Sequence, residues 1–106
     1  MAFEDRQKAE EAKYRHDQEF MFKVRNRRNK LFGLWLAETH LGRSGDEAAA
    51  YAKEVVMADF ERPGDGDVID KVKEDLAAAQ VEISDHMLEK HLLACEEQAK
   101  AQVMGE

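Results

Sequence analysis

The stretch from Phe20 to Leu41 reads FMFKVRNRRNKLFGLWLAETHL and is the longest plausible helix of this 106-residue chain. It contains the single Trp, Trp35, and the densest basic run, from Lys23 to Lys30. Its apolar residues recur at steps of three, four and seven, which is the spacing of one helical face. That face comprises Phe20, Val24, Leu31, Leu34, Trp35 and Leu41. It is interrupted from Arg25 to Lys30, where every residue is polar, so the C-terminal half of the stretch is expected to anchor a helical body.

Gly33 lies inside the apolar pattern of this predicted helix. A glycine costs on the order of 1 kcal/mol relative to Ala in an exposed helix interior. We expect it to permit the close approach of a second helix. A flexible point within the helix is the alternative.

The residues before this helix, 1–19, are rich in charge of both signs, and Phe3, Tyr14 and a few alanines are their main apolar residues. Helix propensity is high, but no broad apolar stripe could dock this segment on a core. Short isolated helices are marginal in water. We therefore predict two parts: an arm, residues 1–19, that is disordered or fraying when free and helical when bound, and a helical body, residues 20–106.

Three shorter amphipathic helices are expected after the long one. Gly42 suits the left-handed position that ends the first helix, and Ser84 or Asp85 is expected to cap the last. The predicted helices span about 20–41, 46–61, 67–79 and 85–101. Because the connecting loops are short, neighbouring helices should be antiparallel, which predicts an all-α fold: a small four-helix bundle with one long helix and a mobile N-terminal arm. The predicted buried positions of the last three helices are Ala49, Ala52, Val56 and Phe60; Ile69, Val72, Leu76 and Ala79; and Met87, Leu88, Leu92, Cys95 and Ala99, with His91 on the same side.

Charge and composition exclude several classes of protein. The net charge is −7, but residues 1–32 hold nine Lys/Arg against six Asp/Glu, and the remainder is strongly acidic. An acidic body would repel phosphate, which argues against general nucleic-acid binding. No apolar run approaches the roughly 20 residues that span a bilayer. With a single Cys, an internal disulfide is impossible, and we expect a cytoplasmic protein that is not inserted in a membrane.

No catalytic or metal-binding motif is recognisable. His86 and His91 are five residues apart, off a common helix face, so with Glu89 they make a poor metal site. The acids Asp65, Asp67 and Asp70 lack the spacing of a calcium loop, and helix capping explains them better. Cys95 is flanked by acids on an apolar stripe, which favours core packing over a nucleophile. The sequence therefore predicts no catalytic residue, no metal and no enzymatic activity.

The basic run from Lys23 to Lys30 is the strongest polar signal. It could be a solvated helix face, or a contact surface for an acidic partner or a phosphate-bearing ligand. Arginine predominates over lysine, which suits bidentate pairing with carboxylate or phosphate. Arg25 and Arg28 are the residues that would make this contact, and an adenine nucleotide is a possible but undetermined ligand. The sequence requires no cofactor.

Three motifs together resemble the ATPase inhibitor subunit zeta family of alphaproteobacteria. They are NKLFGLW at residues 29–35, AYAKEVV at residues 50–56 and ADFERPGD at residues 58–65. The charged stretch from Phe3 to Arg6 extends the likeness to essentially the whole chain.

This resemblance implies a four-helix fold with a mobile inhibitory N-terminal segment. It implies binding to the catalytic sector of the F-type ATP synthase, at an interface between its alternating large subunits, on the cytoplasmic side of the membrane. The protein would block ATP hydrolysis while synthesis proceeds, similar in role to the mitochondrial inhibitor protein. The apolar anchors would be Phe3, Tyr14, Phe20 and Phe22. The paired charges would be Arg6, Lys8, Lys13 and Arg15. The alternative is a cytoplasmic adaptor that binds a partner through the basic face of its body.

Overall fold

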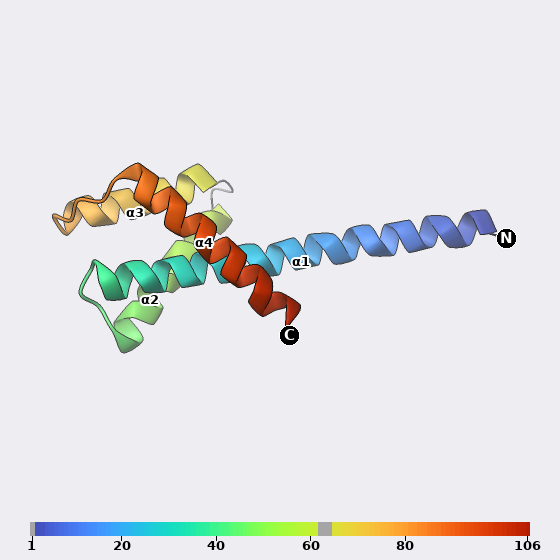
Figure 1. Cartoon of the computed structure of the whole chain (residues 1–106), viewed down its shortest axis with the longest axis horizontal. Coiled ribbons are helices and arrows are strands. Elements are labelled where there is room, and N and C mark those ends of the chain that lie inside the picture. Colours follow the sequence, from blue (N-terminus) through green and yellow to red (C-terminus); the bar gives the residue numbers. More distant parts are fainter. Residues whose placement is uncertain (1, 62–64) are drawn as a thin grey trace.

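The computed structural model describes the backbone of residues 2–61 and 65–106, and the side chains of residues 17–61 and 66–106. Over these ranges the chain forms four α-helices and no strand, which confirms the all-α prediction (Figure 1). The helices are α1 (Ala2–Thr39), α2 (Gly45–Glu61), α3 (Asp65–Ala78) and α4 (Asp85–Met104). Most of the predicted loop between the second and third helices, residues 62–64, lies outside the described residues.

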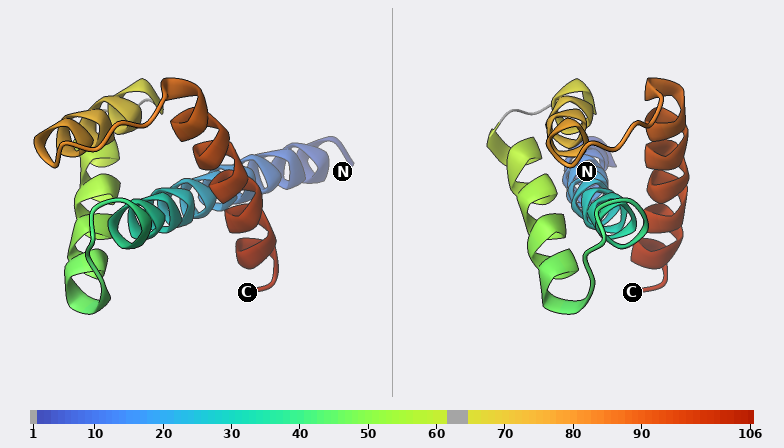
Figure 2. Two further views of the ribbon diagram at one scale, coloured as in Figure 1. Left: turned by 60° about the vertical axis from the view of Figure 1, so that its left-hand side comes forward. Right: turned by 90° about the vertical axis from the view of Figure 1, so that its left-hand side faces the viewer.

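Helix α1 is the axis of the molecule. The three shorter helices pack around its C-terminal half, while its N-terminal half extends beyond them (Figure 1). Viewed along α1, α2 and α4 lie on opposite sides of it and α3 lies on a third side (Figure 2). The result is an elongated molecule of 64 × 25 × 22 Å. Since α1 continues unbroken across residue 20, the boundary between arm and body is one of packing, not of secondary structure.

The core forms where α1 meets the other helices. Phe32, Leu36 and Ala37 are fully buried on α1, whereas the expected residues Leu31, Leu34 and Trp35 are partly buried around them. The apolar face is therefore centred one residue away from its predicted position. The rest of the main core comprises Ala48, Tyr51, Val55, Val68, Val72, Leu76, Leu88, Leu92 and Cys95.

The predicted face of α2 is partly wrong, although Ala52 is buried as predicted and Val56 is partly buried. Ala49 is exposed and Phe60 is half exposed, while Tyr51, Val55 and Asp59 are buried. The face is rotated because two of its buried residues are polar and have partners in other elements. The Tyr51 hydroxyl donates to Asp75 of α3 at 2.8 Å, and Asp59 accepts hydrogen bonds from α1.

On α3 and α4 the prediction is largely correct. Val72, Leu76, Leu88, Leu92, Cys95 and Ala99 are buried as expected, together with Val68 and Val103. Met87 is half exposed, and Ala79 is exposed just after the end of α3. Ser84 caps α4, its Oγ accepting the Met87 N–H at 3.2 Å. Gly42 has the predicted left-handed φ, +66°.

Gly33 lies at a close crossing of two helices, as predicted. A Cβ atom added there would lie 2.7 Å from the Cα of Ala52 and 3.2 Å from Cγ2 of Val55. The α1 and α2 backbones therefore meet at a distance that only a residue without a side chain permits.

Candidate functional site

The most distinctive site is the junction where α1 leaves the body. The last buried residue toward the N-terminus of α1, among the described side chains, is Val24, which packs with Ala99 and Val103 of α4. Phe20 is partly buried against the same small cluster, while residues 17–19 are exposed. The described packing of α1 on the other helices thus ends at Phe20, the first residue of the body.

Beside this apolar contact, α1 is bound to α2 by charge. The Arg25 guanidinium donates to both carboxylate oxygens of Asp59, with Nε–Oδ2 at 2.5 Å and Nη2–Oδ1 at 2.7 Å. The Asn29 amide donates to the same carboxylate at 2.9 Å. A bidentate Arg–carboxylate pair fixes orientation as well as distance. Here it fixes the rotation of α1 relative to α2.

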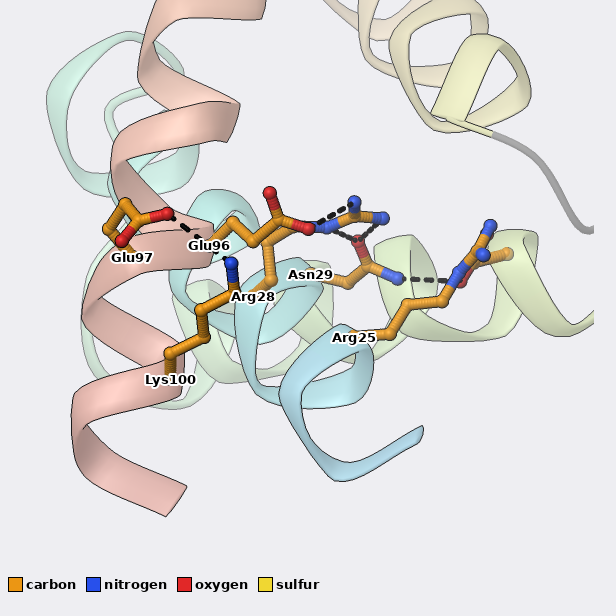
Figure 3. Close-up of polar contacts among 7 residues, drawn as sticks. Arg25, Arg28, Asn29, Glu96, Glu97 and Lys100 are labelled. Atoms are coloured by element: carbon orange, nitrogen blue, oxygen red, sulfur yellow. Dashed lines mark hydrogen bonds and ion pairs between the residues drawn. The ribbon is translucent and has the colours of Figure 1, made fainter. Parts of the chain in front are cut away.

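A second arginine continues this network toward α4. Arg28 is only 3% exposed, and its Nε and Nη2 donate to Oδ1 of Asn29 at 3.1 and 3.0 Å. Its Nη1 lies 4.0 Å from a carboxylate oxygen of Glu96 (Figure 3). We call Arg25, Arg28, Asn29, Asp59 and Glu96 the junction cluster. The cluster joins α1, α2 and α4 around residues 25–29 of α1.

The cluster satisfies the requirement that buried polar groups have partners. No buried side-chain nitrogen or oxygen in the described part of the chain lacks a hydrogen bond. If one partner of such a network is removed, the remaining polar groups stay buried without a hydrogen bond, and the folded state then bears the full free-energy cost of their desolvation. The junction therefore fixes residues 25–29 of α1 relative to α2 and α4.

The basic run does not form one face. Arg25 points to α2, Arg28 is buried, and Arg27 pairs with Gln102 at 3.0 Å and with Glu106 at the end of α4. Lys23 and Lys30 are its exposed members. The single basic contact surface expected on the body is thus absent from the described structure, because most of these cations are used inside the molecule.

The predicted contact residues fall into three groups. The side chains of Phe3, Arg6, Lys8, Lys13, Tyr14 and Arg15 lie outside the described part of the chain. Phe20 packs on the edge of the body. Arg25 and Arg28, expected to face a partner, belong to the junction cluster instead, and the burial of Arg28 removes it from the accessible surface.

The other chemical candidates have structural roles. Cys95 is buried in the core, and this burial raises the pKa of its thiol to about 11. The His91 ring stacks on Trp35 with centroids 3.5 Å apart. Burial, and then the proximity of His40, lower the pKa of His91. Among the described residues, no group of three or more His, Cys, Asp or Glu is placed to hold a metal.

Sequence reasoning missed Asn29 and Asp59, the polar centre of the junction. A signal was present on α1. Arg25, Asn29, Phe32 and Leu36 follow one another at steps of four, three and four, so they continue the apolar face through the polar interruption. No comparable signal marks Asp59, whose partner Arg25 is 34 residues away.

The fold and the junction define a small helical protein: a packed body from which the charged N-terminal part of α1 extends. None of its described helices is long and apolar enough to cross a membrane. The chain matches the family ATPase inhibitor subunit zeta over residues 1–102, arm and body alike, and belongs to that family. It is therefore a regulatory protein and not an enzyme. A search of curated proteins gave no match.

Proposed function

We propose that this protein inhibits ATP hydrolysis by the F-type ATP synthase by inserting its arm, residues 1–19, between two large subunits of the catalytic sector. It would act from the cytoplasmic side of the membrane that holds the enzyme. The observation that supports this most strongly is the arrangement of α1. One half of the helix packs against the other helices of the body, and the other half extends beyond them (Figure 1).

The dimensions of the arm suit insertion into a subunit interface. Residues 2–19 of α1 would measure about 27 Å at the usual helical rise, and a helix with its side chains is about 10–12 Å wide. The body is wider, since the whole molecule measures 25 × 22 Å across its long axis. A cleft that admits one helix would therefore stop the body, so the junction sets the depth of insertion.

The composition of the arm suits a mixed protein surface. Phe3 and Tyr14 would be the apolar anchors, because aromatic side chains carry much of the binding energy at interfaces. Arg6, Lys8, Lys13 and Arg15 would pair with carboxylates of the enzyme, and the six acids of residues 1–19 with its cations. Ordering the arm on binding has an entropic cost, so affinity would depend on which rotational state presents the open interface. State dependence of this kind would allow hydrolysis to be blocked while synthesis proceeds.

A variant lacking residues 1–19 tests the proposal. Purified ATP synthase is titrated with the full chain and with the truncated chain while ATP hydrolysis is followed. The truncated chain should fail to inhibit. Its body should still melt cooperatively, as followed by the fluorescence of Trp35, because the described packing begins at Phe20. Equal inhibition by both proteins would rule out the arm as the inhibitory element.

A further inference from the structure

Two aromatic side chains lie in water at the base of the arm. Phe22 of α1 is 53% exposed and Phe60 of α2 is 52% exposed. Their rings meet edge to face, with centroids 5.6 Å apart. Met21, next along α1, is also half exposed. Single exposed apolar residues are ordinary, but three grouped at one place are typical of a surface that another molecule covers. We call Met21, Phe22 and Phe60 the arm-base patch.

The patch is hollowed on both sides of Phe22. A hollow of about 220 Å³ lies between Phe22 and Phe60, and the paired Arg25 and Asp59 contribute to its lining together with Asn26. An apolar cavity of about 150 Å³ accommodates a benzene molecule, so this hollow has room for one apolar side chain. A second hollow, of about 320 Å³, is lined by Met21, Phe22, Val24, Arg25, Arg28 and Glu96.

The position of the patch relates it to the arm. Phe22 follows the last arm residue, Glu19, by three positions on the same helix, a distance of about 4.5 Å along the axis. Any partner that encloses the arm as far as Glu19 must therefore approach Met21 and Phe22, and through them Phe60. The junction cluster holds α1 and α2 in fixed rotation here, so the two rings are preorganised.

We propose that the arm-base patch is a second contact surface for the ATP synthase. Its occupant is an apolar side chain of a large subunit at the mouth of the cleft that receives the arm, seated between Phe22 and Phe60. The inference rests on the proposed function, because continuity with the arm is what identifies the partner. The patch would add binding energy that the arm alone lacks and would hold the body at the mouth of the cleft.

The test uses the full chain with Phe22→Gln and Phe60→Gln together. Both positions are half exposed and glutamine is a good helix former, so the fold should persist with only a slightly earlier melt. The variant should inhibit ATP hydrolysis at a half-inhibitory concentration at least tenfold higher than the original chain. Met87→Gln is the matched control. Met87 is 51% exposed in the first turn of α4 and lines neither hollow beside Phe22, so its change should leave inhibition unaltered.

Three results would overturn the inference. The first is unchanged inhibition by the double variant while removal of residues 1–19 abolishes it; the proposed function then survives without the patch. The second is equal loss of inhibition in Met87→Gln. The third comes from sedimentation at the assay concentration: an original chain that is dimeric and a double variant that is monomeric would show that a second copy covers the patch. If the double variant melts much earlier, Phe60→Gln alone is compared with Met87→Gln by the same criteria.

Discussion

Replacing Gly33 by Ala tests the helix crossing on which the body is built. The new Cβ would lie 2.7 Å from the Ala52 Cα, a backbone atom that cannot rotate away, and 3.3 Å from the Ala52 Cβ. Overpacking costs about 1–3 kcal/mol, and contact with backbone places this case near the upper end. Alanine recovers about 1 kcal/mol of helix propensity. The net loss of unfolding free energy is about 2 kcal/mol, which lowers the melting temperature by about 10 °C in a domain of this size.

The assay is thermal unfolding followed by circular dichroism, with Gly66→Ala as the matched control. Gly66 lies in the first turn of α3, and a Cβ there would meet nothing within 4 Å. The same substitution should therefore be neutral or stabilising by up to about 1 kcal/mol at Gly66. Opposite signs at the two glycines support close packing of α1 on α2. A Gly33→Ala protein that melts at or above the original temperature would refute it.

Three further predictions concern named side chains. Asp59→Ala removes the acceptor of Arg25 and Asn29 and should cost about 2–4 kcal/mol by urea unfolding, less than a fully buried pair because Arg25 is 38% exposed; unaltered stability would contradict the junction. Because the pKa of His91 is lowered in the folded protein, the unfolded chain binds a proton at His91 more tightly than the folded chain does. The free energy of unfolding should therefore be unaffected by His91 above about pH 6.5 and should decrease as the pH falls below that value. His91→Gln should flatten stability between pH 5 and 7, and an unchanged profile would be inconsistent. The Cys95 thiol, with its pKa raised to about 11, should react with a disulfide reagent at pH 8 only as fast as the protein opens; immediate labelling would show that it is accessible.

The architecture could be predicted because its signals are local. Helix propensity, turn residues and the cap at Ser84 each act within a few residues, and four helices follow from them. Gly33 was informative for the same reason: a glycine in a helix that otherwise favours long side chains needs a packing explanation.

The junction could not be predicted because its energetics are non-local. Because Arg28 is charged, it would be predicted to lie on the surface. Its burial depends on Asn29 beside it and on Glu96 of α4. Likewise, Asp59 is buried and its neighbour Phe60 exposed, the reverse of their hydropathy, because Arg25 supplies the partner that makes burial of a carboxylate tolerable. Hydrophobic patterning alone predicts that the ring of Phe60 is buried. The face of α2 that it predicts is therefore one residue away from the observed face.

The order of the arm is set by its own composition, because residues 17–19 make no packing contact with the body. The prediction that residues 1–19 fray in the free protein stays a prediction, and amide hydrogen exchange tests it. Rapid exchange over the arm that slows in the complex with the ATP synthase is the expected result.

The most direct test of the central claim is photo-crosslinking from the arm. A photoreactive amino acid is placed at Tyr14, and in a control protein at Met87, and each is irradiated with the ATP synthase during ATP hydrolysis. If the arm enters a catalytic interface, position 14 should crosslink to the large subunits and position 87 should not. Crosslinks from position 87 to the enzyme with none from position 14 would show that the body binds and that the arm does not enter.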